Sequence, residues 1–113
     1  MSNTTICDGK TIHITFDGTT AWNFASELQA ILGPQYTNGV MLKSIQFLPS
    51  ATDDAVIVRN VGTADQTSGV LFEALGSSKY AHIPMRFDPP RLCKPSIHGS
   101  DVTGTCKIIM EIE

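Results

Sequence analysis

The chain has 113 residues, of which 42% are hydrophobic and 17% are charged, and its formal net charge is −3. A chain of this length buries roughly two-thirds of its surface around one modest core, and its apolar content excludes a disordered chain. The eight Lys and Arg residues form no stripe that could follow successive phosphates, which argues against nucleic acid as a partner. We therefore expect a single folded domain over residues 1–113.

The low share of charged residues also bears on partners. A surface short of charge is typical of a protein that other chains cover, because interface cores are depleted in charged residues. No apolar run approaches the ~20 residues that cross a bilayer, and we expect no membrane segment. The three cysteines (Cys7, Cys93 and Cys106) form no CxxC pair, which favours reduced thiols in the core over a disulfide framework.

The N-terminal part of the chain predicts a β-hairpin. Asp8-Gly9 separates the runs Thr4–Cys7 and Thr11–Phe16, and Asp-Gly favours the positive φ angles of a type I′ turn. Every second residue of the second run is apolar, which is typical of a strand with one buried face.

The next segment predicts one amphipathic helix, from about Thr20 to Leu32. Its apolar residues recur at spacings of three and four: Ala21, Phe24, Ala25, Leu28, Ile31 and Leu32. Thr19 or Thr20 can cap the first N–H groups, and Gly33-Pro34 ends the helix.

The rest of the chain alternates between strand and turn patterns. Further strands are predicted at Val40–Leu48, Ala55–Val58, Val70–Leu75, Ala81–Phe87 and Thr105–Ile112. Ala55–Val58 is apolar throughout, which favours a central strand covered on both faces. Pro84 lacks an N–H and so places its strand at a sheet edge or a bulge. In the last strand, we expect Cys106, Ile108, Met110 and Ile112 to point inward.

These elements predict a mainly β fold, an antiparallel β-sandwich of about seven strands, jelly-roll-like, with one short α-helix. The long stretch Asp88–Gly104 is rich in Pro, Gly and Ser but contains apolar residues, so we expect an ordered loop there.

Metal and cofactor sites find no support in the residue spacing. The aspartates Asp53, Asp54, Asp88 and Asp101 lack a calcium-loop pattern, and turn formation explains them better. His13, His82 and His98 have no ligand spacing with one another or with the cysteines. We expect neither a metal nor another cofactor.

Catalytic motifs are equally weak. No G-x-S-x-G is present, and Ser100-Asp101 is explained by a turn. Gly76-Ser77-Ser78-Lys79 lacks the frame of a phosphate-binding loop. Because no convergent polar set emerges, we expect that this protein is not an enzyme.

One surface position stands out in the last strand. Ile109 is apolar on the outward side, between Lys107 and Glu111. It either meets the helix or marks a contact with another subunit.

Four runs of the sequence resemble small virion proteins of tailed bacteriophages. The runs are Lys43-Ser44-Ile45-Gln46-Phe47-Leu48-Pro49-Ser50, Asp53-Asp54-Ala55-Val56-Ile57-Val58-Arg59, Lys94-Pro95-Ser96-Ile97 with Ser100-Asp101, and Lys107-Ile108-Ile109-Met110. The similarity spans Val40 to Glu113 and leaves out the N-terminal hairpin and the helix.

This resemblance implies a structural protein of the virion, assembled in the cytoplasm of a bacterial host. The role it favours is a capsid decoration, or cement, protein that stabilises the head lattice through contacts with the major capsid protein or another virion protein. It also implies a homo-oligomer, for which a trimer would suit three-fold lattice positions. The residues assigned to the protein interface are Arg86, Pro89, Pro90, Arg91, Lys94, Pro95 and Ile109.

Two alternatives stay open at this point. One is a place elsewhere in the particle, in the tail, the neck or a fibre. The other is a carbohydrate-binding module, which would need an exposed aromatic platform, for example Trp22, Tyr36 and Tyr80.

Overall fold

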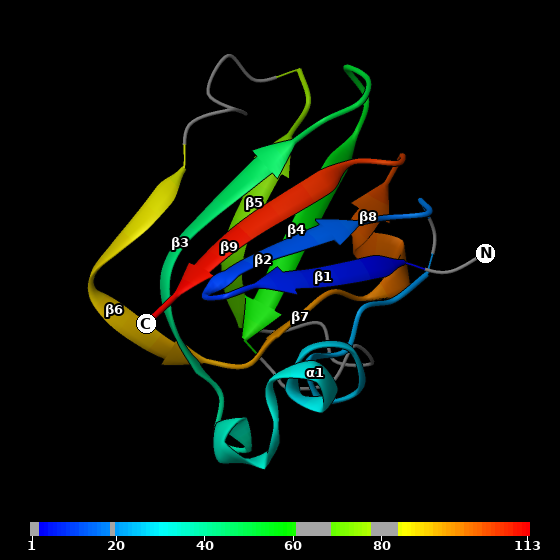
Figure 1. The fold of residues 1–113 in the computed structure, drawn as a ribbon. Helices are drawn as coiled ribbons and strands as arrows, with labels where there is room; N and C mark the ends of the chain where they lie inside the picture. Colours follow the sequence, from blue (N-terminus) through cyan, green and yellow to red (C-terminus); the bar gives the residue numbers. More distant parts are fainter. Residues whose placement is uncertain (1–2, 19, 61–68, 78–83) are drawn as a thin grey trace.

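A computed structural model describes residues 3–18, 20–60, 69–77 and 84–113. In this part of the chain, two antiparallel sheets of five and four strands face each other, and one short helix lies beside them (Figure 1). The expected mainly β, antiparallel class with one short helix is confirmed.

The larger sheet has the order β1-β2-β9-β3-β6. Its strands are β1 (Thr4–Asp8), β2 (Thr11–Thr15), β9 (Lys107–Ile112), β3 (Val40–Leu48) and β6 (Met85–Cys93). The smaller sheet contains β5 (Val70–Leu75), β4 (Ala55–Asn60), β7 (Pro95–Ser96) and β8 (Val102–Thr103). In that sheet, β5, β7 and β8 all pair with the central strand β4.

The N-terminal hairpin is confirmed, but its turn differs from the expected type. Asp8 pairs with Thr11, so Gly9 and Lys10 are the two central residues of the turn. Gly9 has φ 63°, whereas Lys10 has no positive φ. A positive φ at the first central residue alone is the pattern of a type II′ turn, with the glycine in its preferred place.

The core lies between the two sheets and follows the period-2 alternation of their strands. The four residues expected to point inward in the last strand are all buried, with at most 2% of their surface exposed: Cys106, Ile108, Met110 and Ile112. In β4, Val56 and Val58 are buried, but Ile57 between them is only half-buried. The strand is central in its sheet, as expected, and one of its faces is covered less completely than the other.

The helix begins later than the periodicity predicted. Phe24–Gln29 forms a π-helical segment, η1, which continues into α1 (Ala30–Leu32) and ends at Gly33, with φ 109°. A π-helix has a longer turn than an α-helix, so Phe24 and Leu28 point inward while Ile31 rotates out and is 51% exposed. A single 3₁₀ turn, η2 (Pro34–Tyr36), leads to β3.

Long-range contacts explain why Ala21 and Trp22 are not helical. The N–H and C=O groups of Trp22 pair with those of Ile97 at 2.9 and 2.8 Å, which holds the chain extended. The Phe24 N–H then donates to the Ser96 hydroxyl, 3.1 Å away. Since the helix begins after Asn23, Thr20 does not cap it as predicted, and Thr19 lies outside the described residues.

Strand β6 replaces much of the loop predicted at Asp88–Gly104. The strand runs through Pro89 and Pro90 to Cys93, and the rest of the segment forms β7, a 3₁₀ turn at Gly99–Asp101 (η3) and β8. The predicted strand Ala81–Phe87 lies partly outside the described residues, and its described end belongs to β6.

The prolines fit β6 because the strand lies at the edge of its sheet and bulges. Leu42 pairs with Arg91 and Ser44 with Arg86, so the residues 87–90 lie opposite Lys43 alone. Residues within such a bulge donate no ladder hydrogen bonds, and so the missing N–H groups cost nothing there.

Candidate protein interface

Most residues that the sequence assigned to an interface gather on β6. Arg86, Pro89 and Arg91 are exposed on this end strand, Pro90 is half-buried beside them, and Lys94 follows the strand directly. The structure therefore brings these five positions together at one edge of the larger sheet.

The other two assigned residues lie elsewhere. Pro95 is buried in β7, where it pairs with Asn60 of β4. Ile109 lies on the outer face of β9 between His13 and Gln46, with β3 separating it from β6. Helix α1 does not cover that face (Figure 1), so the option that Ile109 meets the helix was wrong.

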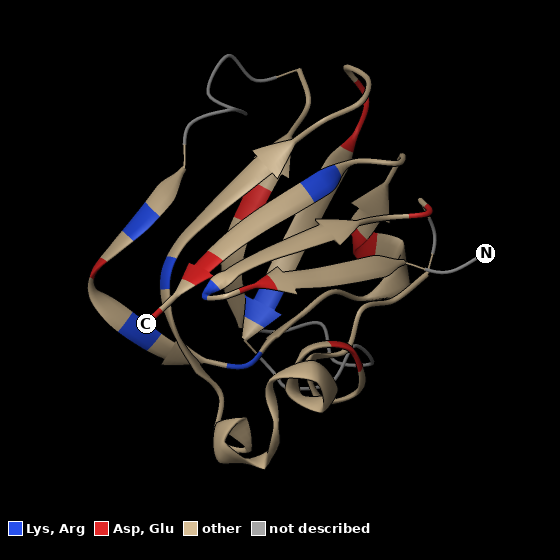
Figure 2. Ribbon diagram, in the orientation of Figure 1, with Lys and Arg blue, Asp and Glu red and all other residues tan. Residues whose placement is uncertain are grey.

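Positive charge concentrates at this edge (Figure 2). Four of the eight Lys and Arg residues lie here, because Lys43 of β3 faces the bulge of β6 and joins Arg86, Arg91 and Lys94. Asp88 is the one acidic residue of β6. Among the described residues, the one ion pair found joins Arg59 and Asp101 and does not involve this edge.

Exposed apolar side chains flank these charges, and the sequence reasoning missed them. Met41 of β3 and Leu92 of β6 are cross-strand neighbours, 37% and 55% exposed, and Met85 is 43% exposed. The alternation of β3 could have predicted that Met41 is exposed, since it falls between the inward residues Val40 and Leu42. We call the set Met41, Lys43, Met85, Arg86, Pro89, Arg91 and Leu92 the β6 surface. Arginine and methionine are enriched in protein interfaces.

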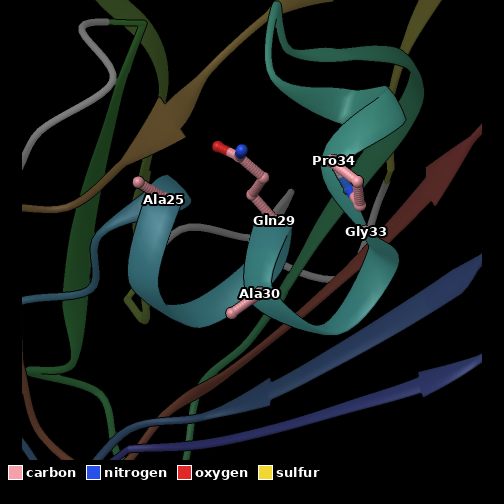
Figure 3. A pocket seen from close by; sticks show the side chains of 5 residues that line it. All are labelled: Ala25, Gln29, Ala30, Gly33 and Pro34. Atoms are coloured by element: carbon pink, nitrogen blue, oxygen red, sulfur yellow. The ribbon is translucent and has the colours of Figure 1, made fainter.

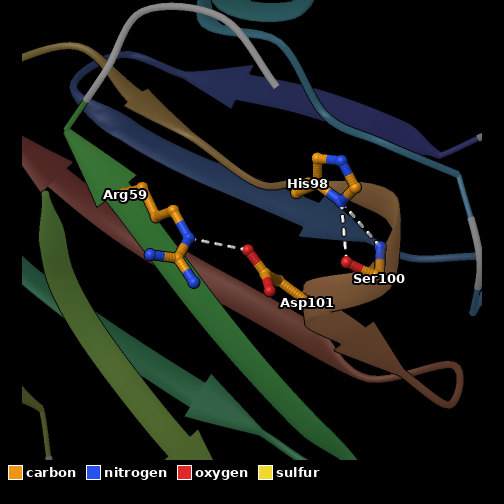
Figure 4. A network of polar contacts seen from close by, with 4 residues as sticks. All are labelled: Arg59, His98, Ser100 and Asp101. Atoms are coloured by element: carbon orange, nitrogen blue, oxygen red, sulfur yellow. Dashed lines mark hydrogen bonds and ion pairs between the residues drawn. The ribbon is translucent and has the colours of Figure 1, made fainter. Parts of the chain in front are cut away.

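A second polar group, around η3, has a structural explanation (Figure 4). Arg59 Nε lies 2.8 Å from Asp101 Oδ2, and both side chains are largely buried. Nδ1 of His98 accepts the Ser100 N–H at 3.1 Å and lies 2.7 Å from the Ser100 hydroxyl. The imidazole thus caps the 3₁₀ turn. Since Asp101 faces Arg59, it does not orient His98, and the three do not form a triad.

Two of the four runs that carry the phage resemblance meet at this ion pair. Arg59 closes the second run and Asp101 closes the third. The second run also supplies Asp54, whose carboxylate is 3% exposed and accepts hydrogen bonds from Ser50 and Ala51. Burial by itself raises the pKa of Asp54, but these hydrogen bonds outweigh it and lower the pKa. Arg59, Asp101 and Asp54 therefore stabilise the fold.

A shallow depression beside the helix offers no reactive group (Figure 3). It has a volume of about 320 Å³ and is lined by Ala25, Gln29, Ala30, Gly33 and Pro34. Gln29 is its one polar side chain, and that amide donates to Thr37 at 3.3 Å.

Metal ligands do not come together in the described part of the chain, where no group of three His, Cys, Asp or Glu residues could hold an ion. The cysteines there are free thiols. Burial raises the pKa of both Cys93 and Cys106 to about 11, which keeps them protonated and unreactive at neutral pH. No helix within the described ranges is long and apolar enough to span a membrane.

The aromatic platform proposed for a carbohydrate module is not assembled from these residues. Trp22 is completely buried, and its indole N–H donates to the Thr5 hydroxyl at 2.9 Å. Tyr36 is half-buried against the core, and Tyr80 lies outside the described residues.

Comparisons of the chain with protein-family models, with curated proteins and with solved structures find no match.

Proposed function

We propose that this protein is a structural component of a tailed-phage virion, a decoration protein that binds the capsid lattice through the β6 surface. One observation carries the proposal: exposed basic and apolar side chains, without ion pairs among the described residues, gather on one bulged sheet edge. Its mixture of Arg, Met and Leu suits a protein partner, and the positive charge suits an acidic one.

Such a protein works by binding alone. Packaged DNA strains a capsid, and a protein that binds across neighbouring subunits of the assembled shell stabilises that state by mass action. Two facing sheets make a rigid support for this contact, and we infer a β-sandwich of jelly-roll type. Arg86 and Arg91 would meet acidic groups of the lattice while Met41 and Leu92 pack beside them.

The experiment is cryo-electron microscopy of virions with and without this protein, combined with a heat-release assay of the packaged DNA. We expect extra density on the shell and release at a lower temperature when the protein is absent. Extra density at the tail, neck or fibre instead of the shell would assign the protein to that part of the particle. Unchanged density and stability would refute the virion role, and binding on a glycan array would then favour a carbohydrate module.

A further inference from the structure

The free edge of β1 has the features of a pairing surface. β1 is an end strand of the larger sheet, and no backbone hydrogen bond found in the described residues joins it to an element other than β2. Natural sheet edges are protected by charges, prolines or bulges. Thr4–Asp8 contains no proline and no bulge, and its one charge, Asp8, lies at the end next to the turn.

The hairpin register fixes which backbone groups reach that edge. In a hairpin with a two-residue turn, the pair that flanks the turn, here Asp8 and Thr11, exchanges hydrogen bonds. Alternation then directs the N–H and C=O groups of Ile6 and Thr4 towards β2. Those of Thr5 and Cys7 point away from β2, towards the free edge.

This spacing is self-complementary. When two β1 strands run antiparallel about an axis at Ile6, Thr5 of each copy lies opposite Cys7 of the other, and all four outward backbone groups on each strand find partners. Every residue of β1 is then paired, and each Asp8 faces a threonine, so like charges do not oppose one another. A two-fold axis at Thr5 or Cys7 would pair fewer residues of β1.

The side chain at the axis supports the same register. Ile6 is 59% exposed, the largest exposed fraction among the large hydrophobic side chains of the described residues. In the paired arrangement, the two Ile6 residues form a non-hydrogen-bonded pair, in which side chains approach most closely. The exposed isoleucine thereby becomes the centre of an apolar contact.

We propose that β1 pairs antiparallel with β1 of a second copy of this chain, about a two-fold axis at Ile6, so that two five-stranded sheets join into one. The contact is isologous and closes as a dimer, which differs from the trimer considered above. It does not depend on the virion role, and β6 remains free in the dimer because it lies at the opposite end of the sheet.

A disulfide tests the register directly. In the full chain with Cys7→Val, we introduce Ile6→Cys and oxidise the protein with oxidised glutathione. The Cα atoms of a non-hydrogen-bonded pair lie about 4.5 Å apart, within disulfide range, so we expect a covalent dimer. Two matched controls should form no covalent dimer under the same conditions: Thr4→Cys, whose partner cysteine would be ~13 Å away, and Ile31→Cys, which is exposed on α1.

A second pair of variants tests the contact without a cross-link. Cys7→Pro removes an outward N–H but none of the β1–β2 ladder, whereas Cys7→Val keeps that donor. Analytical ultracentrifugation should show at least about 100-fold weaker dimerisation for Cys7→Pro than for Cys7→Val, with the fold checked by circular dichroism. Equal cross-linking of Ile6→Cys and Ile31→Cys, equal dimerisation of the two Cys7 variants, or a wild-type monomer at every concentration would overturn the proposal.

Discussion

The two ends of the larger sheet differ in almost every property that controls pairing. β6 is nine residues long, bulged, basic and interrupted by two prolines, whereas β1 has five residues in regular register and one terminal charge. The β6 edge cannot accept another strand readily, because its bulge and prolines break the row of donors. It presents side chains instead, while β1 presents its backbone.

This difference separates two kinds of recognition on one scaffold. Side chains on a rigid edge select a partner by charge and shape, so β6 suits a foreign and acidic surface. Backbone groups select a strand of complementary register, so β1 suits a second copy. The packed core that separates the two edges would let each act without disturbing the other, and the following variants challenge that separation.

The largest expected difference between the edges lies in their cysteines. Cys7 of β1 is half-buried, whereas Cys93 of β6 is 3% exposed and burial raises its pKa to about 11. Burial also raises the pKa of Cys7. A pKa two units above that of an ordinary thiol lowers the thiolate fraction about 100-fold at pH 8, so Cys93 should react at least that much more slowly than in the unfolded chain.

Mass spectrometry after a timed pulse of iodoacetamide, in dilute protein, would locate the labels. We expect Cys7 to be modified first and Cys93 to follow only after unfolding in urea. Because the Cys93 pKa is raised, its labelling should increase as pH rises towards 11. Rapid labelling of Cys93 at pH 8 would mean that the end of β6 opens and is not the rigid edge described above.

Charge reversal on β6 should produce the next largest effect. The double variant Arg86→Glu/Arg91→Glu removes two attractive charges and introduces two repulsive ones, and at roughly 1 kcal/mol for each position it should weaken binding to an acidic lattice about 30-fold. Binding of the purified protein to stripped capsids is the measurement. The matched control, Lys107→Glu on β9, lies away from β6 and should bind as wild type does.

Self-association provides the cross-check on this variant. If the edges act separately, Arg86→Glu/Arg91→Glu should dimerise with unchanged affinity in sedimentation. The Cys7→Pro monomer should still bind stripped capsids through β6. Loss of both activities in either variant would show that the two edges are one interface.

Sequence reasoning reached the strands more securely than the surfaces. The alternation of apolar residues correctly predicted which side chains of β9 are buried. Successive side chains of a strand point to opposite faces whatever the rest of the chain does, so this pattern can be read from the sequence. It failed at the helix start, since Ser96 and Ile97 act on Trp22 and Phe24 from far along the chain. It also read Pro89 and Pro90 as a loop, because nothing local indicates that β3 supplies a register shift opposite them. Arg86 and Arg91 were assigned to an interface through the resemblance, whereas Met41 joined them only through strand pairing.

Removing the hydrogen bond that joins β1 to the core should lower the free energy of unfolding moderately. Thr5→Val keeps the side-chain shape but deprives the buried indole of Trp22 of its acceptor, now 2.9 Å away. Leaving that donor unpaired should lower the free energy of unfolding by about 1–2 kcal/mol. Thr4→Val, on the exposed face of the same strand, should change it by no more than about 0.5 kcal/mol. Equal urea midpoints for the two variants would contradict this anchoring role.

The smallest expected effect concerns the turn that ends β1. Lys10 Nζ donates to the Tyr36 hydroxyl at 2.9 Å and lies 5.6 Å from the centre of the ring, which ties the turn to η2. Tyr36→Phe removes the hydrogen bond but keeps the ring, and at this exposed site it should cost less than about 0.5 kcal/mol in urea unfolding. Tyr36→Leu also removes the cation–π contact, worth about 0.5–1 kcal/mol at such sites, and should cost more. Because the Lys10 contact lies beyond the paired residues of β1, neither variant should alter dimerisation; a change there would mean that the turn itself belongs to the contact between copies.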